Sequence, residues 1–180
     1  MKVESKTRRP LRVLFLCTHN AARSQMAEAL LHRKGGDWFV VASAGAEPAE
    51  AVHPLARQVL AQDGVEWRGR PKGLDAVVSE PWDFVITLCD RAREVCPAFP
   101  GQPVYAHWSI PDPAESVGSE SERLQAFEEA LMYLHRRIDL MRVLPFEQLE
   151  RAAVEHRLGA LGKPLSDSTA SAGTGSGAGR

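Results

Sequence analysis

The sequence predicts an α/β fold, a three-layer sandwich in which helices flank a four-stranded parallel sheet. Short apolar runs alternate along the chain with segments of helical periodicity. Each run contains a continuous apolar stretch rather than an apolar residue at every second position, as expected for strands buried on both faces of a parallel sheet. Ligands bind such sheets beyond the carboxyl ends of the strands, so we expect the functional site there.

The first half of the chain contains two strand–helix pairs. The runs LRVLFLC and WFVVASAG are typical of buried strands. The helix after the first run ends at Gly35-Gly36, and the helix after the second opens with Pro54, which is favourable at the first helical position. The predicted ranges are 11–17 and 38–45 for the strands, and 24–34 and 55–62 for the helices.

The second half adds two strands and two helices. WDFVITLC and PVYAHW are again apolar runs. From Glu120 onward, apolar side chains recur at helical spacing, which predicts a long amphipathic helix that Pro145 ends. The predicted ranges are 82–89 and 103–108 for the strands, and 120–143 and 146–158 for the helices.

The predicted organisation is one domain over 11–160, between a flexible leader (1–10) and a disordered tail rich in Gly, Ser and Ala (161–180). Its 22 basic and 23 acidic residues give a net charge of -1, so we expect no nucleic-acid partner. The apolar runs are too short to cross a membrane, and the apolar stretch after the basic leader is too short for a signal peptide. We therefore expect a cytoplasmic protein and a monomer.

The first strand ends in a motif suited to binding an oxyanion. Cys17 is followed by small and polar residues, then by Arg23 and Ser24 at the start of a helix. Backbone N–H groups of such a turn can surround an anion, and the Arg23 guanidinium can hold two of its oxygens. We expect these positive groups to lower the pKa of Cys17, and Ser24 to donate to the sulfur and cap the helix. A buried thiol that only packs is the alternative.

The stretch CTHNAARSQMAEA resembles the active-site loop of low-molecular-weight tyrosine phosphatases and of the arsenate reductases built on the same fold. The resemblance implies a four-stranded parallel sheet between helices, and it covers 11 to about 143. It implies that the loop residues bind the substrate oxyanion: Thr18, His19, Asn20, Ala21, Ala22, Arg23 and Ser24.

Two further cysteines, Cys89 and Cys96, are seven positions apart. If the segment were helical they would lie about 10 Å apart along the axis. A disulfide between them therefore requires the helix to loosen, which suits a shuttle better than a static brace. Zinc binding is a competing possibility, although the spacing is unlike that of common zinc sites, and an incidental cysteine pair is another.

This pair, followed by proline, resembles the three-cysteine arsenate reductases that are coupled to thioredoxin. Tyrosine phosphatases of this fold lack the pair and usually have a second cysteine in the loop, where this chain has Ala22. The resemblance implies that Cys17 attacks arsenate, Cys89 attacks Cys17 as arsenite leaves, and Cys96 moves the disulfide to the surface for thioredoxin.

Asp112-Pro113, after the last strand, resembles the family's Asp-Pro motif, whose aspartate protonates the leaving oxygen. An acid beside a bound anion is expected to keep a proton to donate. As a lone dipeptide, Asp-Pro is more often simply a turn. His107 and Trp108 nearby are interpreted as wall or core residues.

The resemblance extends to a structural support that some members build around a potassium ion. Asn20, Glu28 and Ser43 match three of its ligands, but Lys72 stands where an aspartate is expected. An ammonium group at that position would replace the ion. We therefore predict no bound metal or cofactor and no potassium requirement, although Glu28 and Lys72 are also compatible with ordinary surface roles.

Three alternatives stay open from the sequence. The main one is a phosphatase acting on phosphotyrosine or small phosphoesters through Cys17, because phosphate and sulfate fit the same loop as arsenate. A second keeps arsenate reduction but replaces thioredoxin with a low-molecular-weight thiol. The third is a thiol sensor without enzymatic activity.

Overall fold

The computed structural model describes residues 9–146, 148 and 150–163. Its four strands are β1 (Leu11–Cys17), β2 (Phe39–Gly45), β3 (Phe84–Thr87) and β4 (Val104–His107). They form one parallel sheet in the order β2-β1-β3-β4, with β1 paired on both sides. Most of the leader (1–10) and of the tail (161–180) lies outside the described residues, so the domain limits stay predictions.

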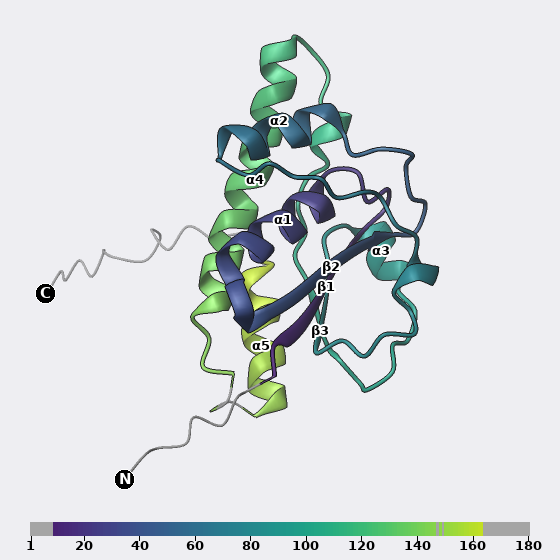
Figure 1. The fold of residues 1–180 in the computed structure, drawn as a ribbon, viewed down its shortest axis with the longest axis vertical. Helices are drawn as coiled ribbons and strands as arrows, with labels where there is room; N and C mark the ends of the chain where they lie inside the picture. Colours follow the sequence, from purple (N-terminus) through teal and green to yellow (C-terminus); the bar gives the residue numbers. More distant parts are fainter. Residues whose placement is uncertain (1–8, 147, 149, 164–180) are drawn as a thin grey trace, which may run out of the picture.

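The helices cover the two faces of the sheet unequally, as Figure 1 shows. The larger layer contains α1 (Arg23–Gly35), α2 (Pro54–Gln62), α4 (Glu120–Arg142) and α5 (Arg151–Leu161). On the opposite face lie α3 (Asp90–Glu94) and a 3-10 turn, η2 (Leu74–Ala76). The predicted fold class, a three-layer sandwich around a four-stranded parallel sheet, is confirmed.

Alternation along β1 divides the core into two clusters. Val13 and Phe15 point into the larger helical layer, whereas Leu14 and Leu16 point into the thinner layer. All four side chains are fully or almost fully buried, which is why 13–16 is apolar at every position.

Two predicted elements differ from the observed ones by more than one residue at an end. The strand predicted over 82–89 is a strand only over Phe84–Thr87, since Cys89 already caps α3. The last helix begins at Arg151 rather than at 146, because the Phe146 ring packs against Phe84, 5.0 Å between ring centroids, instead of continuing a helix after Pro145.

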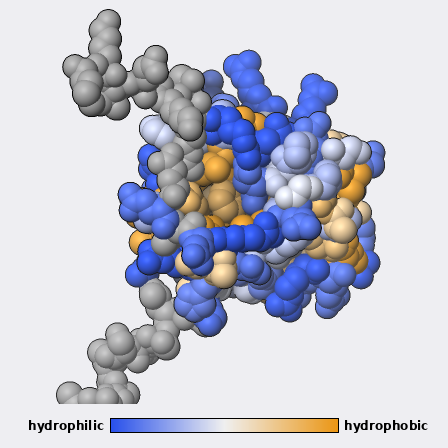
Figure 2. All heavy atoms as spheres, turned by 90° about the horizontal axis from the view of Figure 1, so that it is seen from below, coloured by the Kyte–Doolittle hydropathy of each residue, from blue (hydrophilic) through white to orange (hydrophobic). Residues whose placement is uncertain are grey.

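The surface in Figure 2 is mainly hydrophilic, with apolar side chains gathered in separate patches. Within the described part of the chain, no helix combines the length and the apolar character needed to span a bilayer.

Candidate active site

The loop after β1 contains one residue in an unusual backbone conformation. Asn20 has φ +48°, in the left-handed region, and its side chain is completely buried. Gly45, at the end of β2, lies against this loop. A Cβ on Gly45 would lie 2.6 Å from the Thr18 carbonyl oxygen and 2.8 Å from the Asn20 nitrogen, so only glycine fits.

Asn20 is the centre of a buried hydrogen-bond network. Its Nδ2 donates to Ser24 Oγ at 2.7 Å and to Ser43 Oγ at 2.8 Å. Its Oδ1 accepts from the Lys72 backbone N–H at 2.8 Å and from Gln25 Nε2 at 3.1 Å. These contacts compensate the cost of the left-handed backbone and fix the loop shape.

The predicted support residues meet behind this network. Ser43 Oγ donates to Glu28 Oε2, and Lys72 Nζ lies 3.5 Å from the same carboxylate oxygen. The Lys72 ammonium therefore contacts Glu28, while the Lys72 backbone N–H holds Asn20. Among the described residues, no group of three or more His, Cys, Asp or Glu side chains is arranged to hold a metal ion.

Cys17 lies at the end of β1 with its sulfur 2.8 Å from Ser24 Oγ. The expectation that its pKa is lowered is wrong for this conformation. Burial raises the pKa of Cys17 above its ordinary value, and hydrogen bonds from Ser24 and Asn20 and the charge of Arg23 offset this only in part. The predicted helix cap is also wrong: α1 begins at Arg23 after Ala22, so Ser24 lies within the first turn.

The guanidinium group of Arg23 forms an ion pair with Asp112. Its Nη2 donates to Asp112 Oδ2 at 2.6 Å, and its Nη1 donates to the Ile110 carbonyl at 3.0 Å. Both side chains of the ion pair are largely buried, with 7% and 18% of their surfaces exposed. Asp112 also accepts from the Ala114 N–H, at the start of η3 (Pro113–Glu115). The Asp-Pro turn thus places a carboxylate directly against the loop.

A small cavity of about 40 Å³ lies between the loop and this turn. Predicted site residues supply most of its walls, and Ala114 and His53 complete them. The lining residues are Cys17, His19, Ala21, Ala22, Arg23, His53, Asp112 and Ala114.

The second cysteine reaches the loop. Cys89 Sγ lies 3.3 Å from Oγ1 of Thr18, the residue next to Cys17. Cys89 is also the N-cap of α3, where its sulfur accepts from the Ala92 N–H at 3.4 Å. The side chain is half-buried and the thiol is free.

Cys96 lies just beyond α3, which ends at Glu94. Its free thiol is half-buried, and burial raises its pKa above the ordinary value. It lines a groove of about 440 Å³ that Pro97, Ala98 and Tyr105 share. The short helix α3 therefore separates a cysteine at the loop from a cysteine beside an open groove.

Sequence reasoning missed three residues near the loop: His53, Gln25 and Trp67. His53 directly precedes the predicted helix start at Pro54, yet it lines the cavity and its ring stacks on Phe127, 4.6 Å between centroids. Gln25 and Trp67 join the Asn20 network from positions that carry no local signal. Only the proximity of Gln25 to the motif hinted at such a role.

A family model described as low molecular weight phosphotyrosine protein phosphatase matches residues 12–154. The chain belongs to this phosphatase family. The match includes the loop, both later cysteines and Asp112. Some relatives of this chain have a different named activity.

One such relative is an arsenate reductase from Halalkalibacterium halodurans, 35% identical over 127 residues, which cover 70% of this chain and 91% of the relative. A solved thioredoxin-dependent arsenate reductase from Corynebacterium glutamicum is 36% identical, with a TM-score of 0.54, over 74% of this chain and 64% of that one. A solved low-molecular-weight protein tyrosine phosphatase from T. tengcongensis is 23% identical, with a TM-score of 0.59, over 77% of this chain and 99% of that one. This last likeness supports the family fold alone.

Proposed function

We propose that this protein is an arsenate reductase that reduces arsenate to arsenite through Cys17, Cys89 and Cys96, and that thioredoxin restores its thiols. The observation that carries the proposal is the contact between Cys89 Sγ and Thr18 Oγ1, 3.3 Å, which holds a second thiol at the nucleophile's loop. The identity to arsenate reductases over most of their length supports it.

Arsenate binds the loop from Thr18 to Arg23 in the first step. Backbone N–H groups and the Arg23 guanidinium hold its oxygens, and arsenate takes the place of the Asp112 carboxylate on Arg23. The Cys17 thiolate then forms a sulfur–arsenic bond as one arsenic–oxygen bond breaks. Asp112, held at the edge of the cavity, supplies the proton for the leaving oxygen.

Two thiol steps follow. Cys89 attacks the Cys17 sulfur, a disulfide forms, and the electron pair of the sulfur–arsenic bond stays on arsenic, which leaves as arsenite. Cys96 then attacks Cys89, and Cys17 departs as a thiolate. The resulting Cys89–Cys96 disulfide requires α3 to unwind, which a helix of five residues with one buried side chain opposes weakly.

The position of Cys96 supports a protein reductant. Cys17 is 3% exposed, so a Cys17–Cys89 disulfide would be hard for a second protein to reach. Cys96 lies on an open groove with apolar walls. Transfer to Cys96 therefore brings the oxidised pair to a surface that thioredoxin can approach.

The test compares C89S and C96S variants with the unmodified protein in thioredoxin-coupled arsenate turnover. Both variants should lose at least about 99% of turnover, because each removes a sulfur that no other residue replaces. Mass spectrometry after one turnover should find Cys17–Cys89 in C96S and Cys89–Cys96 in the unmodified chain. Full turnover by either variant would refute the relay.

The same variants separate reduction from phosphatase chemistry. Hydrolysis of para-nitrophenyl phosphate needs Cys17 and Arg23 but not Cys89. Efficient phosphate-ester hydrolysis that C89S retains, without thioredoxin-dependent arsenate turnover, would favour the phosphatase alternative. We expect phosphate and sulfate to act as competing oxyanions at this loop.

We also propose that the protein needs no potassium. The Lys72 ammonium, 3.5 Å from Glu28 Oε2, supplies positive charge beside the Asn20 network. Arsenate turnover should be equal in potassium and sodium salts at matched ionic strength. A clear gain with potassium would contradict the substitution. A cytoplasmic monomer remains our expectation, which gel filtration and cell fractionation can test.

A further inference from the structure

A chain of hydrogen bonds links the surface residue Trp67 to the sulfur of Cys17. Trp67 Nε1 donates to Gln25 Oε1 at 2.7 Å, and Gln25 Nε2 donates to Asn20 Oδ1 at 3.1 Å. Asn20 Nδ2 donates to Ser24 Oγ, which lies 2.8 Å from Cys17 Sγ. Each of these hydrogen bonds joins two side chains directly, so the connection from Trp67 to Cys17 needs no bridging water.

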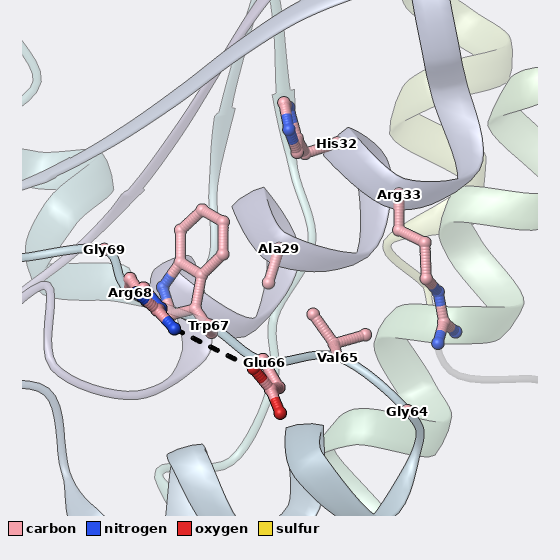
Figure 3. A pocket seen from close by; sticks show the side chains of 9 residues that line it. All are labelled: Ala29, His32, Arg33, Gly64, Val65, Glu66, Trp67, Arg68 and Gly69. Atoms are coloured by element: carbon pink, nitrogen blue, oxygen red, sulfur yellow. Dashed lines mark ion pairs between the residues drawn. The ribbon is translucent and has the colours of Figure 1, made fainter.

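Trp67 stands at the edge of the fold. Its half-buried ring lines a groove of about 530 Å³ between α1 and the segment after α2. Figure 3 shows the ring beside Ala29 at one end of this groove, with Arg33 and Gly64 at the other. Gln25, by contrast, is completely buried.

The direction of each bond can be followed from the donors. The indole N–H can only donate, so it fixes Oε1 as the Gln25 atom that faces Trp67. The amide nitrogen then faces Asn20 Oδ1 and the Arg70 carbonyl, to which it also donates at 2.9 Å. A reversed amide would set an oxygen against two oxygens.

The same logic continues to the nucleophile. With its Oδ1 held by Gln25 and the Lys72 N–H, Asn20 presents its Nδ2 to Ser24. Because the Ser24 oxygen accepts from Asn20, its own hydrogen is left for the Cys17 sulfur. A hydroxyl that donates to sulfur stabilises the thiolate over the thiol.

We propose that Trp67 is a positioning residue for Cys17: through Gln25 and Asn20, its indole N–H fixes the orientation of the Ser24 hydroxyl that activates the thiol. The inference rests on the proposed function only in taking Cys17 as the nucleophile. It assigns a role in the reaction to a side chain on the surface that does not touch the substrate.

The test measures the reactivity of Cys17 alone, in a C89S/C96S background, by iodoacetamide alkylation across pH with intact-mass detection. Trp67→Phe keeps an aromatic ring but removes the N–H donor. It should slow alkylation at neutral pH roughly fivefold and move the pH profile upward, as expected for the loss of one hydrogen bond. The matched control is Trp38→Phe. Trp38 is an exposed tryptophan that takes no part in this series of hydrogen bonds, so its replacement should leave the pH profile of alkylation unchanged.

A double-variant cycle distinguishes positioning from packing. Gln25→Met preserves side-chain volume but removes the amide that connects Trp67 to Asn20. In that background, Trp67→Phe should therefore cause no further slowing of Cys17 alkylation. Thermal melts of every variant show which ones are folded. The proposal would be overturned if Trp67→Phe left the pH profile of Cys17 alkylation unchanged. It would also be overturned if Trp67→Phe slowed alkylation equally in the Gln25 and the Gln25→Met backgrounds. The assay uses no arsenate, so failure of the arsenate reductase assignment would be seen separately.

Discussion

Cys17 and Arg23 lie together, but Arg23 is also paired with the carboxylate of Asp112. Its guanidinium is paired with Asp112 at 2.6 Å, so the field at the sulfur comes from an ion pair rather than from a lone cation. Burial is the main reason why the pKa of Cys17 is raised, and the charge of Arg23 offsets it only in part. In the proposed reaction, an oxyanion that displaces Asp112 takes over the pairing with Arg23.

Asp112→Asn should therefore make the thiol more reactive while impairing catalysis. Without the carboxylate, the Arg23 charge is no longer compensated by Asp112, so it should lower the pKa of Cys17 further. Alkylation of Cys17 at neutral pH should become about threefold to tenfold faster in the C89S/C96S background. Arsenate turnover should fall in the otherwise unmodified chain, because the proposed proton donor is lost. Slower alkylation would show that Asp112 does not compensate Arg23.

At the scale of elements, α2 begins with an unusual cap. His53 precedes Pro54, and its Nδ1 accepts a hydrogen bond from the Leu55 N–H at 3.2 Å. Only a ring with an unprotonated Nδ1 can accept this bond. The pKa of His53 is lowered from its ordinary value of 6.5, first by burial and then by the charge of Arg123, while Asp112 opposes the shift.

This cap makes stability depend on pH with a definite sign. The folded state holds His53 neutral more strongly than the unfolded chain does. Its contribution is therefore present above the ordinary pKa and is lost as pH falls through the lowered one. Thermal melts from neutral to mildly acidic pH should show a steeper loss in the unmodified protein than in His53→Asn, which retains a cap acceptor but does not titrate.

His32→Asn provides the matched control, since His32 is exposed near the end of α1 and away from the cap. It should reproduce the slope of the unmodified protein. If His53→Asn and the unmodified protein lost thermal stability equally steeply as pH falls, the proposed effect of the His53 cap would be contradicted.

At the scale of the molecule, the sequence was informative where interactions are local. Continuous apolar runs located all four strands, and Pro54 and Gly35 marked helix ends. The spacing from Cys17 to Arg23 predicted the loop, since its residues are neighbours in sequence. The positions of Glu28, Ser43 and Lys72 came from resemblance, and the structure brings them together.

Long-range contacts explain what the sequence did not reveal. Arg23 and Asp112 are 89 positions apart, and Trp67 and Gln25 are 42 apart. No local sequence pattern predicts such pairs. For this reason, neither the ion pair of Arg23 with Asp112 nor the proposed role of Trp67 was predicted. The start of α5 was missed because Phe146 packs on Phe84, which is also a tertiary effect.

The two faces of the sheet have unequal cores, which predicts how oxidation affects the fold. Cys89 and Cys96 pack against the smaller cluster, around Leu14, Leu16 and Phe99. In the form with a Cys89–Cys96 disulfide, amide hydrogens of 90–96 should exchange roughly tenfold faster or more than in the reduced form. Those of β1 and α1 should keep their protection. Hydrogen exchange with mass spectrometry measures both, and loss of protection across α1 would contradict the prediction.

The unequal packing has a further consequence for heat tolerance. Local melting of α3 exposes little apolar surface, so it should begin well below the temperature at which the whole protein denatures. Warming would then loosen the segment that carries the disulfide while the oxyanion loop stays formed. The upper temperature limit of turnover would be set by the larger core, and not by the segment that rearranges in the proposed cycle.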